Sequence, residues 1–77
     1  MPTILRVGRY RFAFFSNESR EPADVHVKAG DQQAKYWLEP VELACNYGFR
    51  ACELNEIRRL VAERQAELLE AWYEYFS

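Results

Sequence analysis

Hydrophobic and polar residues alternate along the first half of the chain. In a β-strand successive side chains point to opposite faces, so this alternation predicts strands that each have one apolar face. The apolar members of the pattern are Tyr10, Phe12, Phe14, Val25, Val27, Tyr36 and Leu38. We expect main strands over residues 9–16, 24–28 and 33–39, and a short strand over residues 4–7 that pairs through a turn at Gly8.

Turn-forming residues separate these segments. Residues 16–19 are polar and predict a loop, and residues 29–32 suit the short connection of a hairpin. Pro40 ends the last strand and is well placed as the first residue of a short helix. We predict that helix over residues 41–47, with its end at Gly48, because glycine accepts the left-handed conformation that often ends a helix.

Residues 51–76 have the period of an α-helix. Apolar side chains recur three or four positions apart, as they do on the buried face of a surface helix. The stripe consists of Leu54, Ile57, Val61, Leu68, Trp72 and Phe76. It lapses at Arg64 and Gln65, so the pattern fits either one long helix with a weak middle or two helices with a break near Glu63.

The predicted fold class is α+β, with a three- to four-stranded antiparallel sheet and C-terminal helices packed on one face, in a single domain over residues 1–77. Because the helices come last, we expect them to cover only the apolar face. We call the other face the open face. Its predicted members are Arg9, Arg11, Ala13, Asp24, His26, Lys28, Lys35 and Trp37.

The composition supports a small folded domain, because 49% of the 77 residues are hydrophobic. No apolar run approaches the roughly 18 residues of a membrane span, and the first residues lack the apolar stretch of a signal peptide. We therefore expect a cytoplasmic protein that contacts no membrane, in which Cys45 and Cys52 are reduced, largely buried thiols. One histidine and two distant cysteines do not form a zinc spacing, so we expect no metal and no cofactor.

Charge is divided unevenly along the chain, whose net charge is −2. Residues 1–35 carry six basic and four acidic side chains, whereas residues 36–77 carry four basic and eight acidic ones. An asymmetry of this kind indicates an anionic ligand for the basic half. Solvated faces with an ordinary local bias would give the same pattern.

The open face offers the chemistry of a nucleic-acid surface. Cations neutralise phosphates, and an exposed indole stacks on a base, as on sheet platforms that bind single-stranded RNA. The predicted nucleic-acid-binding residues are Arg6, Arg9, Arg11, Lys28, Lys35 and Trp37. The alternative is a solvated sheet surface in which Trp37 packs under the N-terminal segment.

His26 is the only histidine, and Asp24 lies two positions before it on the same predicted face. A histidine can titrate near neutral pH and transfer protons, so both residues are candidate catalytic groups, with Lys28 or Lys35 steadying an anion. Positions two apart in a strand are separated by about 7 Å, so a direct contact requires side chains that lean together. The alternative is a surface histidine in an ordinary cross-strand pair.

The C-terminal segment is rich in aromatic residues. Neighbouring helical positions are about 100° apart, so one face cannot bury Trp72, Tyr73, Tyr75 and Phe76 together. Trp72 and Phe76 continue the apolar stripe and belong to the core. Tyr73 and Tyr75 are left at its edges, where we predict contact with a partner protein or a second copy of the chain.

Several stretches of the chain resemble the bacterial domain-of-unknown-function family 4160. The matching stretches are residues 1–6, 15–18, 21–27, 34–38 and 69–76. The central motif of that family usually reads Pro-Pro-His-x-His, and residues 22–26 of this chain read Pro-Ala-Asp-Val-His. The second histidine of the motif therefore corresponds to His26, and Asp24 takes the place of the first.

The resemblance also implies a biological setting. Members of the family are often encoded beside another small protein, in pairs that resemble toxin–antitoxin modules, which implies a small cognate partner. We therefore expect a component of such a pair that binds a protein partner and, through the open face, RNA. One alternative is a metal-independent ribonuclease toxin that uses His26, and another is a non-catalytic adaptor that works through its aromatic helix.

Overall fold

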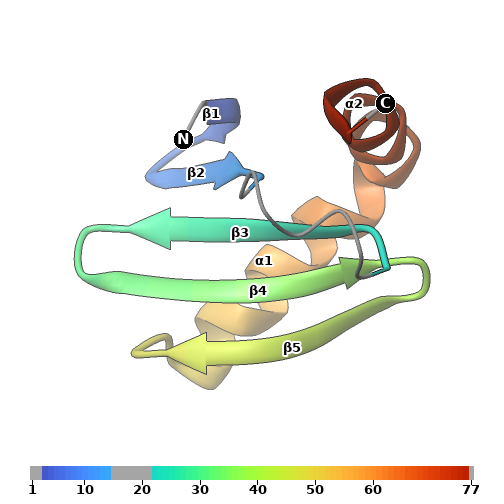
Figure 1. Cartoon of the computed structure of the whole chain (residues 1–77). Coiled ribbons are helices and arrows are strands. Elements are labelled where there is room, and N and C mark those ends of the chain that lie inside the picture. Colours follow the sequence, from blue (N-terminus) through green and yellow to red (C-terminus); the bar gives the residue numbers. More distant parts are fainter. Residues whose placement is uncertain (1–2, 15–21, 77) are drawn as a thin grey trace.

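The computed structural model describes residues 3–14 and 22–76, which form a five-stranded antiparallel sheet and two C-terminal helices (Figure 1). The elements are β1 (Thr3–Val7), β2 (Tyr10–Ala13), β3 (Asp24–Ala29), β4 (Gln32–Leu38), β5 (Val41–Tyr47), α1 (Ala51–Glu63) and α2 (Gln65–Phe76). The α+β class and the antiparallel sheet are confirmed, but the sheet has five strands where three or four were predicted. The loop predicted over residues 16–19 lies outside the described residues.

The strands follow one another in the sheet in sequence order, β1-β2-β3-β4-β5. Three of the four connections are turns of two residues, Gly8-Arg9, Gly30-Asp31 and Glu39-Pro40. Gly8 and Gly30 have φ angles of 57° and 59°, in the left-handed region that glycine enters without a steric cost. Glycine at the first central position is typical of the tight turns that match the twist of a hairpin.

Residues 41–47 form the edge strand β5 and not a helix, so that prediction is wrong. Pro40 lies in the turn between β4 and β5, where its missing N–H breaks no ladder hydrogen bond. The local sequence favours a helix that starts at the proline. In the structure, this segment instead pairs with β4 along its length, so the backbone N–H and C=O groups at that edge of β4 are hydrogen-bonded. The pairing slips by one residue at Ala44, where a bulge lets Cys45 oppose Lys35 while Leu43 opposes Tyr36.

The helical segment is divided at Arg64, so of the two alternatives left open by the sequence, two helices with a break near Glu63 is the one observed. Helix α1 lies behind β3, β4 and β5, and α2 crosses one end of the sheet (Figure 1). The buried residues of the helices are Ile57 and Val61 in α1 and Leu68 and Trp72 in α2. They close a core with the apolar sheet face, as predicted; that face contributes Tyr10, Phe12, Phe14, Val25, Val27, Ala34, Tyr36 and Leu38.

Hydrogen bonds between side chains and backbone attach each helix to the sheet. The buried hydroxyl of Tyr36 donates to the carbonyl oxygen of Leu54 in α1 at 2.8 Å. The Nε2 atom of Gln65, the first residue of α2, donates to the carbonyl oxygen of Leu38 at 2.6 Å. Since both sheet residues belong to β4, this strand fixes the position of both helices.

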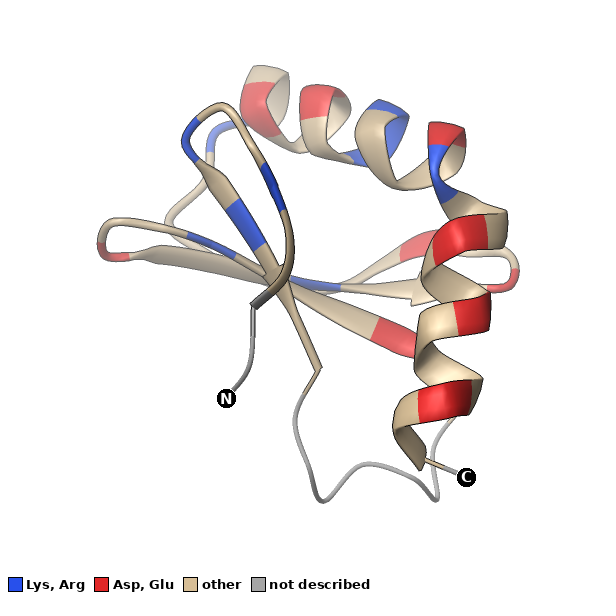
Figure 2. Ribbon diagram, turned by 90° about the horizontal axis from the view of Figure 1, so that it is seen from above, with Lys and Arg blue, Asp and Glu red and all other residues tan. Residues whose placement is uncertain are grey.

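Charged residues are distributed unevenly over the elements (Figure 2). Helix α2 contains three glutamates, Glu67, Glu70 and Glu74, and no lysine or arginine. Strands β1 and β2 contain Arg6 and Arg11 and no acidic residue. Neither helix described by the structure is both long and apolar enough to cross a membrane.

Candidate nucleic-acid interface on the open sheet face

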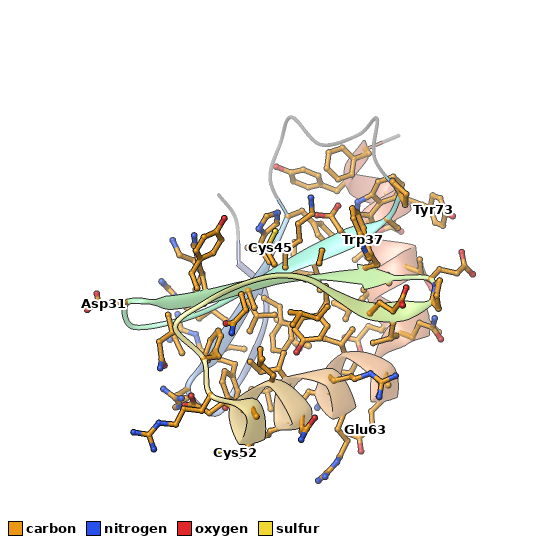
Figure 3. The ribbon with its side chains drawn as sticks, turned by 90° about the horizontal axis from the view of Figure 1, so that it is seen from below. Asp31, Trp37, Cys45, Cys52, Glu63 and Tyr73 are labelled. Carbon is orange, nitrogen blue, oxygen red and sulfur yellow. The ribbon has the colours of Figure 1, made fainter. Side chains whose placement is uncertain are left out.

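The open face of the sheet lies opposite α1. Figure 3 shows Trp37 and Cys45 on this side of the ribbon, whereas Cys52 belongs to α1 on the other side. Strand register and alternation place on the open face Arg6, Arg11, Ala13, Asp24, His26, Lys28, Gln33, Lys35, Trp37, Glu42, Cys45 and Tyr47. Seven of the eight residues predicted for this face are therefore there, and Arg9 is not.

Three cations form a row across the open face. Arg6 of β1 pairs with Arg11 of β2, and Arg11 pairs in turn with Lys28 of β3. Neighbouring strands are only about 4.8 Å apart, and like charges directly opposite each other repel. Among the described residues, no carboxylate lies within ion-pair distance of any of the three. The row is thus a concentration of positive charge that the described part of the chain does not neutralise.

Arg9 takes no part in this row, so its assignment to the open face is wrong. It lies in the turn before β2, where strict alternation does not apply. Its guanidinium forms an ion pair with Glu53 in the first turn of α1 and lies 5.1 Å from the centre of the Tyr10 ring. Arg9 therefore ties the β1–β2 turn to the start of α1 on the covered side of the sheet.

A second cluster lies beside the cation row on the same face. His26 of β3 is paired with Lys35 of β4, and the carboxylate of Asp24 lies between them. Its Oδ2 atom is 3.4 Å from His26 Nε2 and 3.8 Å from Lys35 Nζ. The side chains of Asp24 and His26 therefore lean together across the strand spacing, and the candidate acid-base pair is in contact.

This cluster is less accessible than predicted. The side chains of His26 and Lys35 retain 13% and 14% of their exposure, and that of Asp24 retains 3%. Lys35 Nζ lies 4.7 Å from the centre of the Trp37 ring, so the lysine covers one face of the indole. Solvent reaches the open face on either side of this cluster, at Arg6 and Arg11 and along β5 at Glu42, Cys45 and Tyr47, which are exposed.

The geometry limits what the Asp24–His26 pair can do. A separation of 3.4 Å is longer than the 2.7–3.2 Å of a normal N–H···O hydrogen bond, so the two side chains are in contact but not closely hydrogen-bonded at these atoms. A carboxylate at this place can orient an imidazole, as the orienting acid of a proton-transfer pair does. Lys28 of the cation row follows His26 by two positions on the same face of β3, so the cation row and the Asp24–His26 pair adjoin each other.

The aromatic C-terminus divides as the helical spacing predicts. Trp72 is buried, and Phe76 packs partly against the core. Tyr73 is 57% exposed. Tyr75 is half-buried, with its ring centre 5.7 Å from that of Phe14, so part of its surface is used within the chain. Of the two tyrosines predicted to meet a partner, Tyr73 presents the larger free surface.

Both thiols are exposed, so the prediction that they are largely buried is wrong. Cys45 lies on the edge strand β5, and Cys52 lies in the first turn of α1. The error follows from the helix predicted over residues 41–47, because a helix packed on the sheet would have covered Cys45. Within the described residues, no group of three or more His, Cys, Asp or Glu side chains is placed to hold a metal ion.

The alignment of the cation row is the part of the site that single residues do not reveal. Arg6, Arg11 and Lys28 lie on three different strands, and only the registers of the antiparallel pairs β1–β2 and β2–β3 bring them into one line. The signal available in the sequence is the two-residue spacing of the turn at Gly8, which places Arg6 opposite Arg11.

The fold and this face define a class of small α+β proteins with a helix-covered meander sheet and a basic patch on its other side. The family model described as "Domain of unknown function (DUF4160)" matches residues 10–73, and the chain belongs to this family. The match includes Arg11, the Asp24–His26 pair and both helices up to Tyr73. Neither a curated protein nor a solved structure matches the chain.

Proposed function

We propose that the chain binds single-stranded RNA on its open face, as one member of a toxin–antitoxin-like pair of cytoplasmic proteins. The observation that carries the proposal is the row formed by Arg6, Arg11 and Lys28. The three adjacent cations have no counter-ion among the described residues. When they neutralise phosphates of an RNA, the RNA releases its condensed counterions, and this release favours the complex. The setting as a two-protein pair rests on the family resemblance.

The distribution of charge supports a directed contact with RNA. The chain has a net charge of −2, so a polyanion is not attracted to the molecule as a whole. The three glutamates of α2 repel a polyanion from that end of the molecule, whereas the cation row attracts it to β1, β2 and β3. Trp37 has one ring face covered by Lys35, so phosphate contacts contribute more to binding than base stacking does.

A second candidate function is metal-independent cleavage of the bound RNA. It is favoured by the contact between Asp24 and His26 and by the position of this pair beside the cation row. In such a reaction His26 takes or gives a proton, Asp24 holds its imidazole, and Lys28 or Lys35 stabilises the charge on the phosphate. A third function, that of a non-catalytic adaptor, is favoured by the exposure of Tyr73 alone.

The test measures binding of a fluorescent oligouridylate by anisotropy at several salt concentrations. Three phosphate contacts predict a slope of log K against log salt of about −2. In Lys28→Glu the slope should fall in magnitude by about 0.7, with weaker binding at every salt concentration. Arg64→Glu at the end of α1 makes the same change in net charge away from the open face and serves as the control.

The outcomes separate the candidate functions. Equal binding by Lys28→Glu and the wild-type chain would show that the cation row is only a solvated surface. Gel analysis of the same oligonucleotide decides whether it is cleaved. If the wild-type chain cleaves it and His26→Ala still does so, the acid-base role is wrong. Co-purification of the untagged chain from its own cell identifies the protein partner.

A further inference from the structure

A groove runs between the edge strand β5 and helix α1, on the covered side of the sheet and away from the cation row. Two adjoining hollows of about 420 and 270 Å³ form it, and they share Asn55 and Arg58. Val41 and Leu43 line its strand side, and Leu43 is 43% exposed there. The groove is therefore lined by apolar and basic side chains and by one acidic residue, Glu42, and it is separate from the proposed RNA site.

The strand side of this groove has unused hydrogen-bonding capacity. β5 is the last strand of the sheet, and among the described residues it has one neighbouring strand, β4. The outward backbone groups of an edge strand are a template for pairing with another chain. Native edges are commonly protected by lysine, proline or a bulge; β5 contains neither lysine nor proline within Val41–Tyr47, and its one bulge lies at Ala44. Its only charged residue is Glu42.

The helix side of the groove carries two arginines. Arg58 and Arg59 both line the larger hollow. Within the described residues, neither forms an ion pair, although α1 also contains three glutamates, Glu53, Glu56 and Glu63. Two of these acids are engaged elsewhere, because Glu53 pairs with Arg9 and Glu56 accepts a hydrogen bond from the hydroxyl of Tyr10. Arg58 and Arg59 thus line the groove beside β5 without a carboxylate partner among the described residues.

We propose that this groove binds an extended acidic segment of a partner protein, which adds to β5 as a sixth strand and places its carboxylates on Arg58 and Arg59. Strand addition explains the unpaired edge, because main-chain hydrogen bonds supply affinity while alternate side chains supply specificity. Arginine suits the binding of the partner's carboxylates, because its planar guanidinium can donate two parallel hydrogen bonds to one carboxylate. The proposal does not depend on RNA binding.

Charge argues for a different protein over a second copy of this chain. Antiparallel self-pairing of β5 would place a two-fold axis near the middle of the strand, at Ala44. Leu43, which adjoins that position, lines the same hollow as Arg58. The Arg58 side chains of the two copies would therefore approach each other, and like charges in an interface are unfavourable.

The experiment uses a short synthetic peptide in which Glu alternates with Thr and Val, titrated into the full chain labelled with ¹⁵N. We expect the amide signals of β5 to shift and their hydrogen exchange to slow, because they gain hydrogen-bond partners. The same peptide with Lys in place of Glu should bind at least tenfold more weakly to the wild-type chain. This comparison needs no variant, so it holds even if a substitution impairs folding.

The arginines are tested by charge reversal. Arg58→Glu should weaken the acidic peptide at least tenfold and strengthen the lysine peptide. Arg64→Glu, which has the same charge change on a residue outside the groove, should bind the acidic peptide as the wild-type chain does. The proposal is overturned if Arg58→Glu binds the acidic peptide normally, if protection appears at another strand, or if light scattering shows a dimer whose β5 amides are protected without peptide.

Discussion

The hydroxyl of Tyr36 makes a specific prediction about how the sheet holds α1. Tyr36 is 1% exposed, and its hydroxyl donates to the carbonyl oxygen of Leu54 at 2.8 Å. Tyr36→Phe removes this bond and keeps the ring, so no cavity larger than one oxygen atom is left. The Leu54 carbonyl keeps its helical partner four residues later, so the loss is that of one hydrogen bond, about 0.5–1.5 kcal/mol. For a domain of this size each 1 kcal/mol lowers Tm by about 4–8 °C.

The same substitution has a pH signature. Burial raises the pKa of Tyr36 above its ordinary value, so the folded chain disfavours the phenolate. The stabilisation by neutral Tyr36 is complete below the pKa of the unfolded chain, about 10, and is lost as pH rises through the folded pKa. The difference in free energy of unfolding between the wild-type chain and Tyr36→Phe should therefore shrink between about pH 8 and about pH 11.

The assay is urea unfolding followed by far-UV circular dichroism at both pH values. Tyr10→Phe is a parallel case, because burial and the hydrogen bond to Glu56 also raise the pKa of Tyr10. Two results would refute the reasoning. One is a Tyr36→Phe variant as stable as the wild-type chain near neutral pH. The other is a stability difference that stays constant through the alkaline range.

Two further substitutions test the core and the hairpins. Ile57→Ala, at a fully buried position of α1, should cost about 2–5 kcal/mol in urea unfolding, and a cost below about 1 kcal/mol would mean that α1 does not pack on the sheet as described. Gly30→Ala should cost about 1–2 kcal/mol in free energy of unfolding, because φ is 59° there and alanine is strained in the left-handed conformation. No clash adds to this strain, because an added Cβ meets no atom within 4 Å. Unchanged stability in Gly30→Ala would mean that the turn does not hold its left-handed conformation.

Much of the covered face was predictable because burial imposes a period. Residues such as Phe12, Val27 and Tyr36 recur at every second position, and a shift of one residue would move all of them to the wrong face. The stripe of α1 and α2 was predictable for the same reason, and its lapse at Arg64 coincides with the observed break. In both cases the pattern is repeated over many residues, so local exceptions do not change the outcome.

The strand β5 was not predictable from its own residues. The segment Val41–Tyr47 lies between a proline and a glycine, Pro40 and Gly48, which are typical start and end residues of a short helix. Nothing in the local sequence shows that β4 would have an unpaired edge if this segment were a helix. The groove between β5 and α1 was missed with it. Arg58 and Arg59 belong to the polar side of the helix in the sequence, and they gain a role only when the edge strand lies beside them.

The site was predictable in its residue types but not in its geometry. Alternation alone places Asp24, His26 and Lys28 on one face. It says nothing about the lean that brings Asp24 within 3.4 Å of His26, because side-chain torsions are set by packing among neighbours. Arg9 shows the opposite limit, since a turn breaks the alternation and sends its side chain to Glu53.

The order of the strands has a consequence for synthesis on the ribosome. Because β1 to β5 pair in the order in which they are made, each hairpin can form as soon as its second strand has emerged. The helices that cover the sheet come afterwards, from residues 51–76. In a chain that folds in this order, Phe12, Val25 and Val27 lie on an apolar sheet face that only the last-made residues cover, so folding is complete only after the C-terminal helices have been released.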